Sequence, residues 1–209
     1  MNQNLKKIIA IVAGLILVFV AYFGSYLPLQ KSHLFIKTMR NLSQINSLQE
    51  FEEAMSTVLE FNSPIGQEEL LRQFASTIID VINQPNTPPE VVKELITYLN
   101  KYYEPIIQSG SGMSFNQNLY VLGTLNEIAA LKTQNPEFLS AAKTYYLKSY
   151  EIGPKRPQAL FGLFDIYRIE GNVEEVKKIH EQILTQWPGE KKTKQAFEEF
   201  LSKVSSSNQ

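Results

Sequence analysis

The sequence predicts an all-α protein in which one N-terminal transmembrane helix is followed by a stack of helix pairs. Three observations predict this fold: an uncharged apolar run near the N-terminus, apolar residues at helical spacing throughout the rest of the chain, and a 34-residue internal repeat. No segment shows the sustained alternation of apolar and polar residues that is typical of strands. The 209 residues suffice for an anchor and one ordinary domain.

The apolar run is long enough to cross a bilayer once. Its apolar part, Ile8–Tyr26, has 19 residues, which at about 1.5 Å of rise per residue gives a helix of roughly 28 Å. A cleaved signal peptide is the alternative, but bulky aromatics such as Tyr22 stand where its cleavage site needs small residues. We therefore expect an uncleaved anchor that contacts lipid through residues 8–26 and a helix stop at Pro28.

The orientation of the anchor is predicted from the charges that flank it. A short basic leader before a long apolar run is typical of a signal anchor, which favours a cytoplasmic amino terminus and an extracytoplasmic tail. Lys31, Lys37 and Arg40 on the other side of the run favour the opposite orientation. The expected location is the cytoplasmic membrane, with a single pass.

Helical periodicity, interrupted by Pro, Gly, Asn and Ser, divides the rest of the chain into elements. The expected helices are Lys31–Gln44, Leu48–Phe61, Gln67–Asn83, Pro89–Tyr103, Phe115–Lys132, Glu137–Ile152, Pro157–Glu170, Val173–Gln186 and Glu190–Lys203. The expected regions are a leader and anchor at 1–30, degenerate helical repeats at 31–107, a flexible linker at 108–114, repeats with a capping helix at 115–204, and a disordered tail at 205–209.

The internal repeat lies between Pro154 and Pro188, which are 34 residues apart. The matching residues are Ala159, Leu163 and Tyr167 in a first helix, Gly171-Asn172 in a turn, and Val176, His180 and Ile183 in a second helix. This unit resembles a tetratricopeptide repeat (TPR). The resemblance implies a TPR-like right-handed α-α superhelix, in which small residues let helices approach closely and the proline ends the second helix.

An earlier unit resembles the same repeat less closely. Its first helix carries Leu122-Gly123 and its second helix carries Ala142. Gly123 and Ala142 are 19 residues apart where the repeat has 12, so either the turn or the helix is longer.

The order of elements is also similar to a more specific group. An apolar span, the run Leu34–Ile45, the stretch Phe51–Ala75 and the TPR-like units resemble the extracytoplasmic C-terminal tail of bacterial O-antigen ligase or polymerase family proteins. In that family, glycan transfer belongs to a bundle of many membrane helices. This chain has one span, so the resemblance does not imply that it catalyses glycan transfer.

Composition argues against several classes of active site. The chain has no cysteine, and His33 and His180 are its only histidines, so a thiol nucleophile and a multi-histidine metal site are excluded. His180 is expected to pack half-buried in its repeat. The formal net charge of −1 favours no nucleic-acid partner. We expect no enzymatic activity, no cofactor and no metal.

Charge is distributed unevenly along the tail. Residues 41–131 contain three basic and eleven acidic residues, whereas residues 132–209 contain twelve basic and ten acidic ones. In the second part, basic and aromatic residues interleave and are expected to line a concave groove. The candidate groove residues are Tyr146, Tyr150, Lys155, Arg156, Phe161, Phe164, Tyr167 and Lys177.

The groove predicts a function in recognition, because stacked helix pairs present a concave surface to an extended peptide or a partner helix. The favoured function is a membrane-anchored, TPR-like scaffold for protein–protein interaction at the bacterial cell envelope. A multi-span membrane protein is one candidate partner. The alternative is an accessory or split-off tail of an O-antigen ligase or polymerase type of envelope glycan system.

Overall fold

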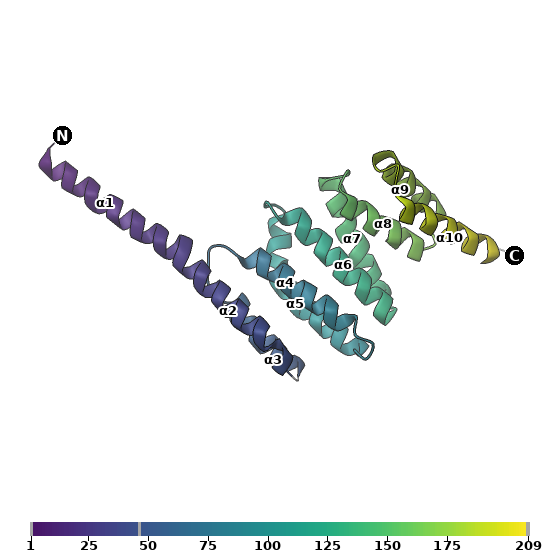
Figure 1. Ribbon diagram of the computed structural model, residues 1–209, viewed down its shortest axis with the longest axis horizontal. Helices are drawn as coiled ribbons and strands as arrows, with labels where there is room; N and C mark the ends of the chain where they lie inside the picture. The colour runs from purple at the N-terminus through teal and green to yellow at the C-terminus, as the bar shows by residue number, and fades with distance from the viewer. Residues whose placement is uncertain (1, 46, 208–209) are drawn as a thin grey trace. The chain divides into compact units, whose positions relative to one another are not determined.

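The computed structural model describes residues 2–45 and 47–207, and these residues form helices and turns without a strand. The elements are α1 (Gln3–Ala21), a π-helical turn (Tyr22–Tyr26), α2 (Leu27–Asn41), a 3₁₀ turn (Leu42–Gln44), α3 (Leu48–Leu59), α4 (Gln67–Ile82), α5 (Pro89–Ser109), α6 (Phe115–Thr133), α7 (Pro136–Ile152), α8 (Pro157–Ile169), α9 (Val173–Gln186) and α10 (Lys191–Ser207) (Figure 1). The all-helical class is confirmed.

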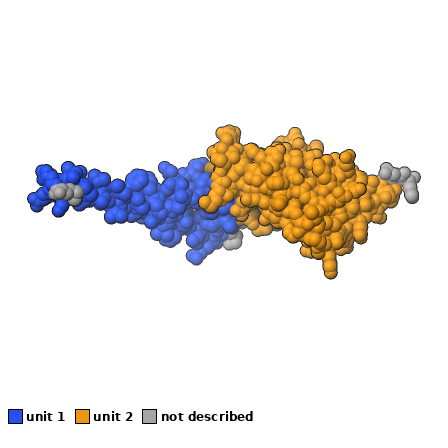
Figure 2. Space-filling model, turned by 90° about the horizontal axis from the view of Figure 1, so that it is seen from above, with its two compact units in different colours: residues 1–74 blue, residues 75–209 orange. Residues whose placement is uncertain are grey.

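The chain forms two compact units, residues 1–74 and residues 75–209, which Figure 2 shows in different colours. The division falls within α4, so that helix contributes residues to both cores.

The first unit begins with one long helix that is long and apolar enough to cross a membrane. The expected helix stop at Pro28 is wrong, because α1, the π-helical turn and α2 run on from Gln3 to Asn41. In the π-helical turn, the Leu27 N–H donates to the Tyr22 carbonyl five residues earlier. A π-helical turn accommodates the local disruption of helix hydrogen bonding that a proline causes. Pro28 itself stands in the first turn of α2, where proline is tolerated.

The rest of the first unit is a small core between α2, α3 and the start of α4. Helices α2 and α3 contact each other, and Met55, Val58 and Leu71 are completely buried. The rings of Phe35 and Phe74 meet edge to face with centroids 5.3 Å apart. Ser47 caps α3 by accepting a hydrogen bond from the Glu50 N–H, as a capping box predicts.

In the second unit, successive helices run in alternate directions and pack in sequence order (Figure 1). Helix α6 contacts α5 and α7 and also α8, while α9 contacts α8 and α10. The first helices of neighbouring pairs, α6 and α8, therefore adjoin each other. Apolar side chains of all these helices fill the core, among them Leu119, Leu122, Ala142, Leu163 and Ile183.

Several expected bounds differ from the structure: for example, the helix expected over Lys31–Gln44 is α2, which runs from Leu27 to Asn41. Helix α5 continues through the exposed Pro105 to Ser109 and ends at Gly110, whose φ of 63° is left-handed, so the linker expected from residue 108 begins two residues later. Helix α10 reaches Ser207, so residues 205–207 are helical, and residues 208–209 lie outside the described part. In the longer repeat unit, the extra length belongs to α6, which has 19 residues.

Candidate functional site

The side chain of Tyr146 organises the packing of α6, α7 and α8. It projects from α7 and is buried, with an exposed fraction of 1%. A Cβ atom added at Gly123 of α6 or at Gly162 of α8 would lie 2.5 Å from the Tyr146 ring. Only glycine lets both helix backbones approach the two sides of the ring this closely.

The hydroxyl of Tyr146 meets polar groups of α6. It donates a hydrogen bond of 2.7 Å to Oε2 of Glu127 and lies 3.1 Å from Oγ1 of Thr124. This network holds Glu127 in one orientation at the surface where α6 and α8 adjoin.

A second carboxylate, Asp165 of α8, lies in the same region. Its Oδ1 atom accepts a 2.8 Å hydrogen bond from Nη1 of Arg168, one turn further along α8. The Arg168 guanidinium also lies over the ring of Phe164, 5.4 Å from its centroid. Nε of Arg168 is buried and has no hydrogen-bond partner within the described residues.

These groups line a hollow of about 390 Å³ between α6, α8 and α10. Its lining residues are Glu127, Leu131, Asp165, Arg168, Ile169, Phe200 and Lys203. A second hollow of about 380 Å³ shares Leu131 and Ile169 with it and extends to the turn between α6 and α7. Together the two hollows, which share Leu131 and Ile169, form what we call the first-helix groove. One end carries the acids Glu127 and Asp165 together with the bases Arg168 and Lys203, and the walls at the other end are mainly apolar.

Burial changes the proton affinity of both carboxyl groups. It raises the pKa of Glu127, the hydrogen bond from Tyr146 opposes that rise, and the charge of Asp165 adds to it. Burial also raises the pKa of Asp165, against the opposing effect of Arg168. Asp165 is about half exposed and already pairs with Arg168, so Glu127 is the less well solvated of the two carboxylates. A cation that enters the groove meets Glu127 beside this ion pair.

The groove is the candidate binding site, because shifted carboxyl groups and apolar walls that converge in one hollow are a general feature of recognition and active sites. Among the described residues, no group of three or more His, Cys, Asp or Glu side chains is placed to hold a metal ion. The groove offers a ligand polar contacts with Glu127, Lys203 and the Asp165–Arg168 ion pair. It also offers apolar contact through Leu131, Ile169 and Phe200.

The eight residues that the sequence places in a groove do not line one surface, because five of them belong to or pack against a single hydrophobic cluster inside the second unit. Tyr146, Phe164 and Tyr167 are core side chains, with exposed fractions of 1%, 3% and 7%. They are buried because aromatic rings fill the gaps between neighbouring helices, which takes them away from the surface.

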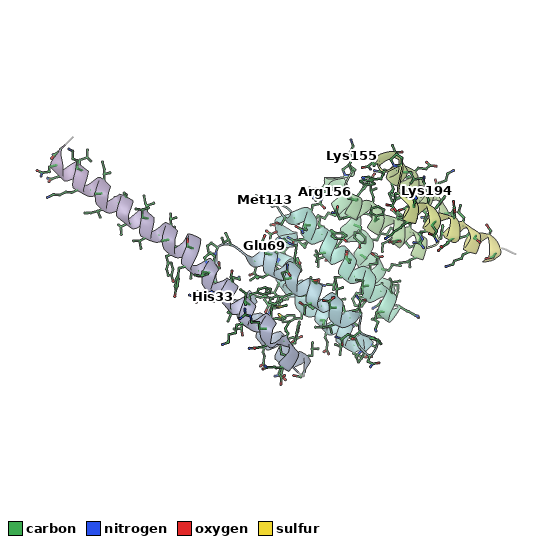
Figure 3. All side chains as sticks on the ribbon, viewed as in Figure 1. His33, Glu69, Met113, Lys155, Arg156 and Lys194 are labelled. Carbon is green, nitrogen blue, oxygen red and sulfur yellow. The ribbon has the colours of Figure 1, made fainter. Side chains whose placement is uncertain are left out.

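The other five lie at the surface or between second helices. The Tyr150 hydroxyl donates to Oε1 of Gln182 on α9, and the ring of Phe161 stacks on Trp187 with centroids 6.1 Å apart. Lys177 is exposed on α9 and faces Glu181 at 4.0 Å. Lys155 and Arg156, labelled in Figure 3, lie in the turn between α7 and α8.

Arg156 lines a separate polar hollow of about 300 Å³. Its other lining residues are Asn116, Gln117, Tyr120, Ser149 and Gln158. Asn116 and Ser149 are buried there and bond to each other, with the Ser149 hydroxyl donating to Asn116 Oδ1. Of the eight predicted residues, Arg156 thus lines a hollow, which it shares with residues of α6.

The sequence interpretation did not find Glu127, Asp165 and Arg168. A usable signal exists: Glu127 follows Gly123 by four residues and Asp165 follows Gly162 by three, so both acids stand one turn after a glycine of a first helix. The two acids are 38 residues apart in the sequence and come to line one hollow only when α6 and α8 pack.

His180 is the half-buried packing residue that the sequence predicts. Its ring stacks on Phe197 with centroids 4.2 Å apart and lies 6.3 Å from that of Phe164. Burial lowers the pKa of His180, and the charges around it act in both directions: Lys194 lowers that pKa, whereas Glu181 and Glu198 raise it.

Comparison with known proteins adds no relative: no family model, no curated protein and no solved structure matches the chain.

Proposed function

We propose that this protein is a membrane-anchored, TPR-like scaffold whose first-helix groove binds a partner segment carrying a basic side chain next to apolar ones. The observation that carries the proposal is the position of Glu127 and Asp165 in one hollow with the apolar side chains of Leu131, Ile169 and Phe200. The apolar helix Gln3–Asn41 supports the anchor. The contact between α6 and α8 supports a stack of helix pairs, whose first helices face a common ligand in TPR-like arrangements.

The charge of the partner follows from the state of Glu127. Burial opposes ionisation of this group, and a lysine or arginine side chain in the groove restores a favourable interaction to it, whereas Asp165 already pairs with Arg168. Hydrogen bonds to charged groups contribute about 1.5–3 kcal/mol, so a single basic side chain dominates recognition. The apolar end at Leu131 and Ile169 then selects neighbouring aliphatic residues.

A peptide pair tests this proposal. The probe is a labelled ten-residue peptide with one lysine between leucines, compared with the same peptide carrying norleucine in place of the lysine. Fluorescence anisotropy with the full chain in detergent micelles should show the lysine peptide binding at least about tenfold more tightly, as expected for about 1.4 kcal/mol or more.

The matched variant is Glu127→Gln, which keeps an oxygen for the Tyr146 hydroxyl and removes the negative charge. It should abolish most of the preference for lysine, whereas Glu137→Gln, an acid on α7 outside the hollow of Glu127, should leave the preference unchanged. Equal binding of both peptides to the unaltered protein contradicts the proposal. Crosslinking from Leu131 in membranes then identifies the natural partner, and recovery of a glycan-transferring membrane protein would favour the alternative function.

The proposal places the tail outside the cytoplasm. Because the chain has no cysteine, Met113→Cys, at a fully exposed position, supplies one thiol for labelling. A membrane-impermeant maleimide should label this variant in intact spheroplasts as well as it does after lysis. Labelling only after lysis would show that Lys31, Lys37 and Arg40 set the opposite orientation.

A further inference from the structure

The first unit exposes an isoleucine at the tip of a short loop. Residues 60–66 connect α3 to α4, and Ile65 in this loop has an exposed fraction of 58%. The loop is held in place by two local features: the Ser63 hydroxyl donates a 2.9 Å hydrogen bond to the Ile65 carbonyl, and Gly66 has a left-handed φ of 95°. Ile65 is therefore presented on an ordered turn.

A lysine fixes the height of this loop along the anchor helix. Nζ of Lys31 on α2 donates a 3.0 Å hydrogen bond to the Phe61 carbonyl and a second one to Oε1 of Gln67. The lysine is buried, with an exposed fraction of 2%. Both ends of the loop are thus tied to Lys31, and Figure 1 shows the connection from α3 to α4 beside the junction of α1 and α2.

Lys31, which holds the loop of residues 60–66, lies only a short distance along the helix from the end of the apolar span. Lys31 follows Tyr26, the last residue of the apolar run, by five residues, which is about 7.5 Å along a helix. The headgroup layer on each side of a bilayer is roughly 5–7 Å thick. A loop held at the level of Lys31 accordingly stands at the outer edge of the headgroup layer when residues 8–26 span the hydrocarbon.

We propose that the loop of residues 60–66 is a second membrane contact, in which Ile65 enters the headgroup layer of the same bilayer that the anchor crosses. This inference rests on the membrane anchor of the proposed function. Tyr26 and Leu29, whose side chains are about half exposed on the anchor helix, lie in the same layer. The contact adds a second attachment point, so the first unit is held at a defined tilt on the surface.

The charges around the loop specify the kind of lipid contact. Glu60, Glu68 and Glu69 flank the loop, and the lysine at its level is buried; Figure 3 labels Glu69 at the start of α4. Acidic residues gain nothing from anionic headgroups, so the contact is apolar and works on a neutral surface. The acids also limit how deeply the loop enters.

Site-directed spin labelling of the full chain tests the contact, because the cysteine-free sequence accepts single cysteines. Nitroxides are placed by Ile65→Cys and Ile36→Cys in separate proteins in phosphatidylcholine nanodiscs. Ile36 is an exposed isoleucine on α2, with an exposed fraction of 44%, and lies ten residues beyond Tyr26, about 15 Å along the helix. Val18→Cys reports the hydrocarbon and Met113→Cys reports water.

Power saturation with oxygen and a nickel chelate gives the depth of each label. The immersion depth of the Ile65 label should lie between those of the Val18 and Met113 labels, and the Ile36 label should be as exposed to water as the Met113 label. These depths should not change when a third of the lipid is phosphatidylglycerol. An aqueous value at Ile65 beside a buried Val18 label overturns the loop contact and leaves the anchor standing. An aqueous value at Val18 overturns the anchor itself. Lipid values at both isoleucines, or a strong effect of anionic lipid, also overturn the proposed contact.

Discussion

Replacing Gly162 by alanine is expected to destabilise the second unit by about 2 kcal/mol. The new methyl group would lie 2.5 Å from the Tyr146 ring, and Gly123 backs the same ring so closely that a Cβ added there would also lie 2.5 Å from it. The ring has no room to move away, so the substitution overpacks the α6–α7–α8 contact, which typically costs 1–3 kcal/mol. This loss exceeds the gain of up to about 1 kcal/mol in helix propensity that alanine brings.

Hydrogen exchange of the α6 and α8 amides in the full chain measures the effect, since unfolding of this packing exposes them. Gly189→Ala is the control: no atom lies within 4 Å of its added Cβ, and the stability should change by less than about 0.5 kcal/mol. Combining Gly162→Ala with Tyr146→Leu should cost less than the sum of the two single changes, because the ring that causes the clash is gone. Additive costs would contradict the proposed packing.

Replacing Lys31 by methionine is expected to loosen the junction between the anchor helix and α3. The change removes both hydrogen bonds of the ammonium group and leaves the Phe61 carbonyl without that donor. Losing the partner of a buried acceptor costs about 1–3 kcal/mol. Methionine keeps most of the apolar volume, which separates the lost hydrogen bonds from a packing defect.

Faster hydrogen exchange should appear at residues 59–67 in the Lys31→Met variant and remain absent from α6–α10. Lys37→Met, at an exposed position of the same helix, serves as the control and should leave exchange at residues 59–67 unchanged. Unaltered protection in the Lys31 variant would show that apolar packing alone, including Phe35 against Phe74, holds the first unit together.

Local sequence signals were enough to predict where most of the helices lie. Most expected helices agree with the structure to within a few residues, because caps and breakers act over one turn: Ser47 caps α3, Asn135 caps α7 and Asn172 caps α9 through their side chains. The errors lie at Pro28 and Pro105, where a π-helical turn and an exposed position let the helix continue. A proline raises the free energy of a helix locally, through a lost hydrogen bond and a steric clash, and the surrounding structure decides whether the helix ends there.

Candidate site residues were harder to predict. Periodicity identifies which face of a helix is apolar, but it does not say which aromatic side chains the neighbouring helix covers. Phe164 and Tyr167 therefore turned out to be core residues. Charge counting along the chain likewise missed Glu127 and Asp165, because each acid stands alone in the sequence.

The sequence by itself determined the apolar helix, the order of the helices and the close approach at Gly123, since hydrophobic length, caps and small residues are local properties. Only the tertiary structure decided that Tyr146 passes between Gly123 and Gly162 to reach Glu127, and that Asp165 lines the same hollow. The physical reason is that contacts between α6, α7 and α8 depend on the rotation and depth of whole helices. Side-chain packing across all three helices sets those quantities jointly.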